Sequence, residues 1–161
     1  SRESDIESWM RAGHGIVALS EPLGPAYDWL PDAIQPATGS CVHRDNIVVV
    51  DTTHPVLNNL TSSSLSGWGS SSHGNFLNSG GLDVLTTDGS GNAITLAGTL
   101  GSGRVVLTLQ DPHWHNPSGR PDIVFVQNML DWASLPVPEP DSFIMLAISL
   151  SVLFLFVQSK K

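Results

Sequence analysis

The sequence predicts an α/β sandwich, in which helices cover a β-sheet. Three observations lead to this prediction: an amphipathic helical segment precedes the first apolar strand, β-rich runs fill the middle of the chain, and a second amphipathic segment follows them. The length of 161 residues suits roughly one domain. With 40% hydrophobic and 14% charged residues, the composition is that of a globular chain rather than a disordered one.

The first half of the chain predicts a helix followed by strands. "ESDIESWMRAG" places Ile6, Trp9 and Met10 on one side of a helix. Gly13 is suited to cap the end of that helix. "GIVALS" is a short apolar run, typical of a strand that is buried on both faces. "AYDWLPDAI" predicts a short helix or a helical turn.

The second half predicts more strands and a closing helix. "NIVVVD" and "GLDVLTTD" are each expected to form a strand. "NAITLAGTLGSGRVVLTLQ" predicts a hairpin, because two β-rich runs flank Gly101-Ser102-Gly103, which can supply positive φ angles. "PDIVFVQNMLDWAS" predicts a helix with these apolar positions: Ile123, Phe125, Val126, Met129, Leu130 and Trp132.

The charge pattern separates the body of the chain from its last two residues. The formal net charge is −8 at pH 7. Both lysines, Lys160 and Lys161, stand at the C-terminus, and the rest of the chain carries five arginines against 15 acidic residues. Binding to phosphates requires clustered Lys and Arg, so the composition argues against a nucleic-acid partner.

An uncharged apolar run precedes the two lysines. Residues 143–157 contain no charge, no proline and no glycine, and show no polar face at helical spacing. A transmembrane helix needs about 20 residues, which the run approaches when its flanking residues are included. We therefore expect 143–157 to be a transmembrane helix and 158–161 to be a basic cytoplasmic tip. The alternative is a buried C-terminal helix.

A proline-rich motif connects the body to this apolar run. Pro136, Pro138 and Pro140 alternate with other residues, which excludes a helix and favours an extended spacer. The order of Pro138-Glu139-Pro140, an apolar run and a terminal basic pair resembles the PEP-CTERM sorting signal of exported bacterial proteins. An ordinary proline linker is the alternative. The resemblance implies that an exosortase, a membrane transpeptidase-like enzyme, cuts near the motif in residues 135–142.

The sorting resemblance also implies where the protein works. Members of this class are often connected with extracellular polysaccharide and biofilm production. We therefore expect a bacterial cell-envelope protein whose body lies outside the cytoplasm, held by its C-terminal helix and released or transferred after processing. The implied partners are the exosortase, membrane lipid and an extracellular polysaccharide. The first residues, "SRESDIESWMR", do not resemble a signal peptide, and we interpret the sequence as N-terminally truncated.

Three segments of residues 1–134 carry a second resemblance. "RAGHGIVALSE", "LGSGRVVLT" and "FVQNMLDWAS" occur in the order of similar motifs in class I glutamine amidotransferase-like domains and their ThuA-like relatives. This resemblance implies a partial flavodoxin-like three-layer sandwich with a β-hairpin. Complete domains of that family have further strand-helix units before the first motif, which also fits a truncated N-terminus.

The catalytic chemistry of the amidotransferases is not expected in this chain. Their nucleophilic Cys lies in a glycine-flanked turn, where this sequence has Ser20-Glu21-Pro22. The sole cysteine, Cys41, lies outside such a turn. It could form a thiolate pair with His43 on one side of a strand, but a small buried thiol is the simpler interpretation. We predict no catalytic residue and no cofactor.

Two loops contain candidate binding residues. "QDPHWHNPSG" places Asp111, His113 and His115 at a spacing that could hold one divalent metal ion. The alternative for this segment is a polar loop after the hairpin. "SGWGSSSHGNF" contributes Trp68, His73 and Phe76, which could stack on a sugar in a candidate ligand loop, although a flexible surface loop is the alternative.

The prediction as a whole is an exported surface or matrix module without catalytic activity. The competing hypothesis is a secreted hydrolase or metal-dependent enzyme that uses the His113 and His115 loop. The two hypotheses differ in what they require of these histidines, since only the second needs a stoichiometric metal ion there.

Overall fold

The computed structural model describes residues 2–19, 29–31, 33–37, 42–115 and 120–137, without the side chains of 2, 113–114 and 120–122. Its helical elements are α1 (Arg2–Arg11), the 3-10 turn η2 (Pro55–Leu57), α2 (Ser62–Leu65), α3 (Pro112–His115) and α4 (Arg120–Ser134). Its strands are β1 (Ile16–Leu19), β2 (Ile34–Pro36), β3 (Ile47–Val49), β4 (Phe76–Ser79), β5 (Asp83–Asp88), β6 (Ala93–Leu100) and β7 (Gly103–Thr108).

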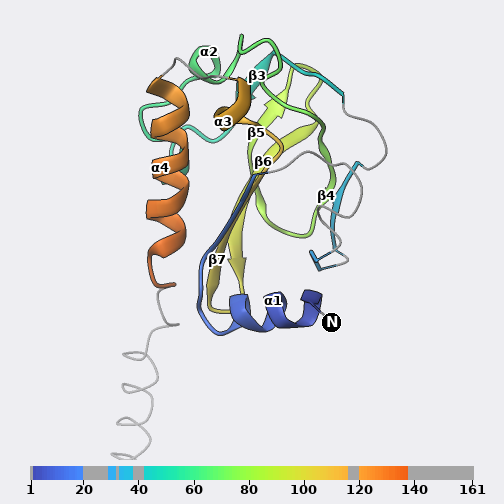
Figure 1. Cartoon of the computed structure of the whole chain (residues 1–161), viewed down its shortest axis with the longest axis vertical. Coiled ribbons are helices and arrows are strands. Elements are labelled where there is room, and N and C mark those ends of the chain that lie inside the picture. The colour runs from blue at the N-terminus through green and yellow to red at the C-terminus, as the bar shows by residue number, and fades with distance from the viewer. Residues whose placement is uncertain (1, 20–28, 32, 38–41, 116–119, 138–161) are drawn as a thin grey trace, which may run out of the picture.

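These strands form one curled sheet built around the β6–β7 hairpin. The strand order is β1-β7-β6-β4-β2, and β3 joins through β5, which pairs with β6. Among the described strands, β1 and β7 are parallel and the remaining pairs are antiparallel. Figure 1 shows α4 along one side of the sheet and α1 across the end where the hairpin turns.

The predicted flavodoxin-like three-layer sandwich is wrong. That fold has a mostly parallel sheet with helices on both faces. A parallel connection needs a crossover of about a dozen or more residues, whereas short turns join antiparallel strands. The connections from β5 to β6 and from β6 to β7 contain four and two residues, so these paired strands must be antiparallel. The observed fold is a mixed α/β structure with a curled sheet.

The predicted transmembrane helix at 143–157 lies outside the described residues, as do the sorting motif Pro138-Glu139-Pro140 and the basic tip with Lys160 and Lys161. Within the part of the chain that the structure describes, no helix is both long and apolar enough to cross a membrane.

Two apolar clusters lie on opposite faces of the sheet. Successive residues of a strand point to opposite faces, and β7 therefore directs Val106 into one cluster and Val105 and Leu107 into the other. We name the first the α4 cluster; it contains Ile47, Val56, Leu57, Leu60, Leu65, Leu85, Ile94, Ala97, Val106, Phe125, Met129 and Trp132. The α1 cluster contains Met10, Leu30, Ile34, Phe76, Leu82, Leu96, Val105, Leu107 and Leu109.

Several predicted elements are confirmed. The N-terminal helix is α1, with Gly13 at a φ of 99° just after it, and the closing helix is α4. The predicted hairpin is formed by β6 and β7, and Gly101 has the positive φ of 64° that its two-residue turn requires. The three strands predicted from "GIVALS", "NIVVVD" and "GLDVLTTD" are β1, β3 and β5.

One predicted element differs at its end, in the part that the structure describes, and a further strand begins at the last residue of a predicted loop. The end of "AYDWLPDAI", expected to be helical, begins strand β2 at Ile34. This strand pairs with β4, which begins inside the candidate ligand loop at Phe76. The pairing joins residues about 40 positions apart and supersedes local preference, as is usual for short strands.

Candidate metal centre

The carboxyl end of β7 leads directly into the short helix α3. Leu109, Gln110 and Asp111 connect the two elements, and Pro112 occupies the first helical position, which suits its fixed φ and its missing N–H. The backbone N–H of His115 donates to the carbonyl oxygen of Asp111 at 3.2 Å. This single helical turn returns His115 to the vicinity of Asp111.

A distant part of the chain brings His73 to the same place. The N–H of His73 donates to the carbonyl oxygen of Leu109 at 3.0 Å. Next to it, Ser72 forms antiparallel bridges with both Gln110 and Arg44. The backbone thus fixes residues 72–73 between the end of β7 and residues 42–44, and His73 is only 2% exposed.

His73, Asp111 and His115 form a group with the composition of a metal site. Each offers one ligand atom, and these atoms all lie within 4.8 Å of one another. The rings of His73 and His115 have centroids 4.7 Å apart. Ligand atoms around a tetrahedral zinc ion are about 3.3 Å apart, given metal–ligand distances of about 2.0 Å. Small side-chain movements would therefore suffice to surround an ion.

A chain of buried polar groups supports this end of the sheet. The Gln110 side-chain amide donates to the carbonyl oxygen of Leu65 at 3.2 Å. The Gln110 backbone N–H donates to the Thr108 hydroxyl at 3.1 Å. That hydroxyl is 2.9 Å from the Thr95 hydroxyl, which accepts a hydrogen bond from the Thr86 hydroxyl. Because hydrogen bonds are directional, these contacts fix the backbone immediately before Asp111.

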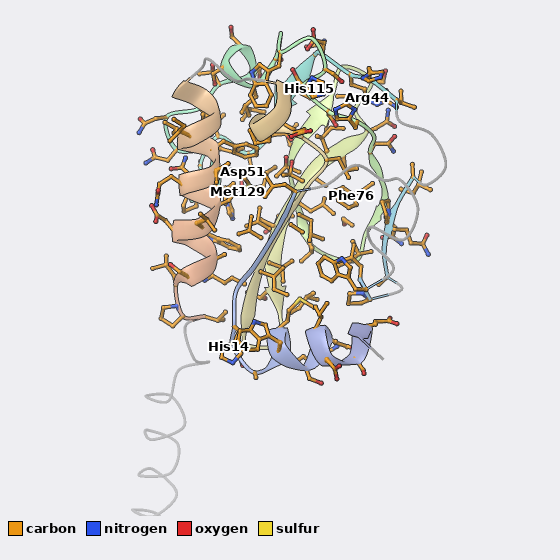
Figure 2. All side chains as sticks on the ribbon, in the orientation of Figure 1. His14, Arg44, Asp51, Phe76, His115 and Met129 are labelled. Atoms are coloured by element: carbon orange, nitrogen blue, oxygen red, sulfur yellow. The ribbon has the colours of Figure 1, made fainter. Side chains whose placement is uncertain are left out.

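An ion pair supports the neighbouring segment. Arg44 lies 2.6 Å from the carboxylate of Asp88 and donates to the side chain of Asn75 at 3.2 Å. Burial alone would raise the pKa of Asp88, but hydrogen bonds from Asn92 and Ser90 and the charge of Arg44 outweigh it, so the pKa is lowered. The carboxylate therefore stays ionised and holds Arg44 in place. Figure 2 shows Arg44 and His115 at the same end of the molecule, far from His14.

The structure joins some of the predicted candidates and separates others. Asp111 and His115 are brought together, whereas the side chain of His113 is not among those that the structure describes. The third member is His73, which the sequence assigns to a candidate ligand loop. Sequence spacing could not reveal it, because its position depends on the bridge between Ser72 and Gln110.

The other two members of that ligand loop lie apart from each other. Trp68 packs against the α4 cluster, and its indole N–H donates to the carbonyl oxygen of Ser64 at 3.1 Å. Phe76 is buried in the α1 cluster on the opposite face of the sheet. Trp68, His73 and Phe76 therefore do not form a common stacking surface. Cys41 lies outside the described residues, and its predicted partner His43 contacts His73.

Comparisons with known proteins identify similar folds. No protein-family model matches the chain, and no curated protein matches it. The similar solved structures include Cytoplasmic Protein STM3548 from Salmonella typhimurium and Cytoplasmic Protein STM1381 from Salmonella typhimurium LT2. Both have a TM-score of 0.62, with 14% and 17% sequence identity and 82% and 83% of this chain covered. The chain spans 60% of each of those proteins, and the likeness is one of fold.

These findings correct the predicted localisation. The sequence predicts a membrane-anchored protein of the cell envelope, but none of the helices in the described ranges could cross a bilayer. Both similar structures are named as cytoplasmic proteins. The sorting signal, the exosortase and a polysaccharide partner stay predictions.

Proposed function

We propose that this protein binds one divalent transition-metal ion of the zinc class through His73, Asp111 and His115. The observation that carries the proposal is the convergence of two imidazoles and a carboxylate, whose ligand atoms lie within 4.8 Å of one another. The three residues come from two separate parts of the chain, and backbone hydrogen bonds hold those parts together.

The ligand types decide which ion is expected. Imidazole nitrogens suit zinc, copper, nickel and iron, whereas magnesium and calcium prefer sites made of oxygen ligands. Two histidines with one carboxylate are a common donor set for zinc. We therefore expect zinc to bind and magnesium to compete poorly.

The site lies where a metal ion would connect parts of the fold. His73 belongs to the segment before β4, while Asp111 and His115 belong to the end of β7 and to α3. An ion bound by all three would cross-link these segments and stabilise the folded chain, since the unfolded chain offers no preformed site. The proposed role is that of a metal-binding module.

Metal content and affinity test the proposal. The full chain is first stripped of metal with a chelator, then given a small excess of zinc, and then dialysed to remove unbound zinc. Elemental analysis should find one zinc ion per chain. His115→Ala should lower the zinc affinity by at least about tenfold, as removal of supporting groups already costs about 10- to 100-fold. Asp111→Asn gives a second variant that keeps the side-chain shape.

His14→Ala is the matched control. His14 is exposed, stacks on Trp9 and lies at the opposite end of the molecule from His115 (Figure 2). It should leave the zinc affinity unchanged. Zinc that binds equally well to His115→Ala, Asp111→Asn and the unmodified chain would contradict the proposal.

A further inference from the structure

His43 lies beside the metal-site residues without belonging to their group. Its ring centroid is 5.0 Å from that of His73, and the two rings are inclined by 72°. Three imidazoles thus follow one another in space, His43 to His73 and His73 to His115. His43 as a whole residue is accessible to solvent.

The backbone around His43 is fixed relative to His73. The N–H of Val42 donates to the carbonyl oxygen of His73 at 3.3 Å. Arg44 and Ser72 exchange two backbone hydrogen bonds, each of 2.9 Å. His43 and His73 are therefore neighbours across two paired segments, and this pairing keeps the two rings close together.

One nitrogen of the His43 ring already has a partner. Nδ1 lies 2.6 Å from the hydroxyl oxygen of Ser70, which is buried. Histidines that bind metals through one ring nitrogen usually hold the other nitrogen in a hydrogen bond, which orients the ring. The contact with Ser70 assigns Nδ1 to that supporting role and leaves Nε2 for an ion.

We propose that His43 provides the fourth ligand of the metal ion through Nε2. This inference rests on the proposed function, since it requires an ion at His73, Asp111 and His115. Zinc sites closed by four protein ligands are structural, whereas sites with three protein ligands keep a position for water and are typical of catalysis. With His43 bound, the site is closed.

The closed site would connect a third part of the fold. His43 precedes β3 and neighbours Arg44, whose ion pair with Asp88 reaches the end of β5. An ion bound by His43 therefore cross-links the approach to β3 with the segment before β4 and with α3. The buried polar groups at this end of the sheet include Thr108 and Gln110, and we call it the polar end. The metal would stabilise the polar end rather than activate a water molecule.

Cobalt substitution with azide as a probe tests the fourth ligand. Cobalt(II) has visible absorption that depends on its ligands, and azide binds only where a position is open or holds water. The spectrum of the cobalt-loaded full chain should not change with azide. The spectra of His43→Ala and His43→Asn should change with azide, while both variants still bind one cobalt ion.

The outcomes separate the two proposals. A chain that binds no cobalt or zinc would overturn the proposed function and the fourth ligand together. A cobalt-loaded chain whose spectrum responds to azide as strongly as that of His43→Ala would overturn the fourth ligand alone. The exposed control His14→Ala should behave like the unmodified chain, and circular dichroism should show that the His43 variants are folded.

Discussion

The α4 cluster and the polar end of the sheet are neighbours in the fold, but different forces stabilise each of them. In the α4 cluster, Phe125 and Met129 are fully buried among aliphatic side chains. At the polar end, Gln110 and His73 are equally buried but are placed by hydrogen bonds. Apolar packing depends on the volume that is filled, whereas hydrogen bonds depend on direction.

Because of this difference, we expect the two regions to contribute differently to stability and to zinc affinity. Loss of volume beneath α4 should lower the stability of the whole chain without moving the metal-site residues relative to one another. Loss of a directional contact beside Asp111 should cost less stability but should disturb the position of a ligand. Stability and zinc affinity can therefore be measured as two independent readouts of the two regions.

The largest effect is expected in the α4 cluster. Phe125→Ala should lower the free energy of unfolding by about 3 to 5 kcal/mol, because it removes a fully buried ring and leaves a cavity. Leu130→Ala on the same helix, where the side chain is 51% exposed, should cost far less. Urea denaturation of the metal-free full chain measures both. The zinc affinity of folded Phe125→Ala should stay within about twofold of that of the unmodified chain. A loss of zinc affinity as large as that expected for His115→Ala would show that the two regions are coupled.

An intermediate effect is expected at Gln110. Gln110→Met keeps the volume but removes the amide that donates to Leu65, leaving a buried carbonyl without that partner, at a cost of about 1 to 3 kcal/mol. Gln127→Met is the control, because Gln127 is exposed on α4 and its amide donates to Asp131 one turn further along the same helix. Denaturation and zinc titration should both detect Gln110→Met, and an unchanged zinc affinity would argue against a positioning role.

The sequence predicts the elements whose pattern is local. Helix α1, helix α4 and the hairpin are predictable because amphipathic spacing and a glycine turn are encoded over a few residues. Strands β2 and β4 are not, since their pairing joins distant, short segments. The three-layer fold that motif order predicts is wrong. The connections from β5 to β6 and from β6 to β7 are short, and short connections favour antiparallel pairing.

The candidate site is predictable only in part. Asp111 and His115 are close in sequence, and their residue types suggest a metal ion. His73 and His43 could not be added, because both reach the site through backbone pairing of Ser72 with Gln110 and Arg44. His73 also lies in a serine-rich segment that is typical of a surface loop, yet Ser71 and Ser72 are buried, and their hydroxyls donate to the Asp45 carboxylate and to the backbone.

The smallest expected effect is a pH dependence of stability that arises at the edge of the α4 cluster. His54 lies at the edge of the α4 cluster, with its ring 4.8 Å from that of Trp132, and Nδ1 accepts a hydrogen bond from the N–H of Val56. Burial lowers the pKa of His54 below 6.5, and Arg104 acts in the same direction, while Asp51 and Asp83 oppose the shift. The unfolded chain therefore binds a proton more readily than the folded chain, and stability should fall as the pH drops below about 6.5.

His54→Gln keeps an acceptor for Val56 but cannot titrate. In metal-free protein, it should flatten the fall in unfolding free energy between about pH 7 and pH 5.5. The difference should stay below about 1 kcal/mol, because the ring is only half buried and solvent screens its charge. Urea denaturation across this range measures it. If the slope of His54→Gln matches that of the unmodified chain, burial of His54 is not the source of the acid sensitivity, and this prediction is wrong.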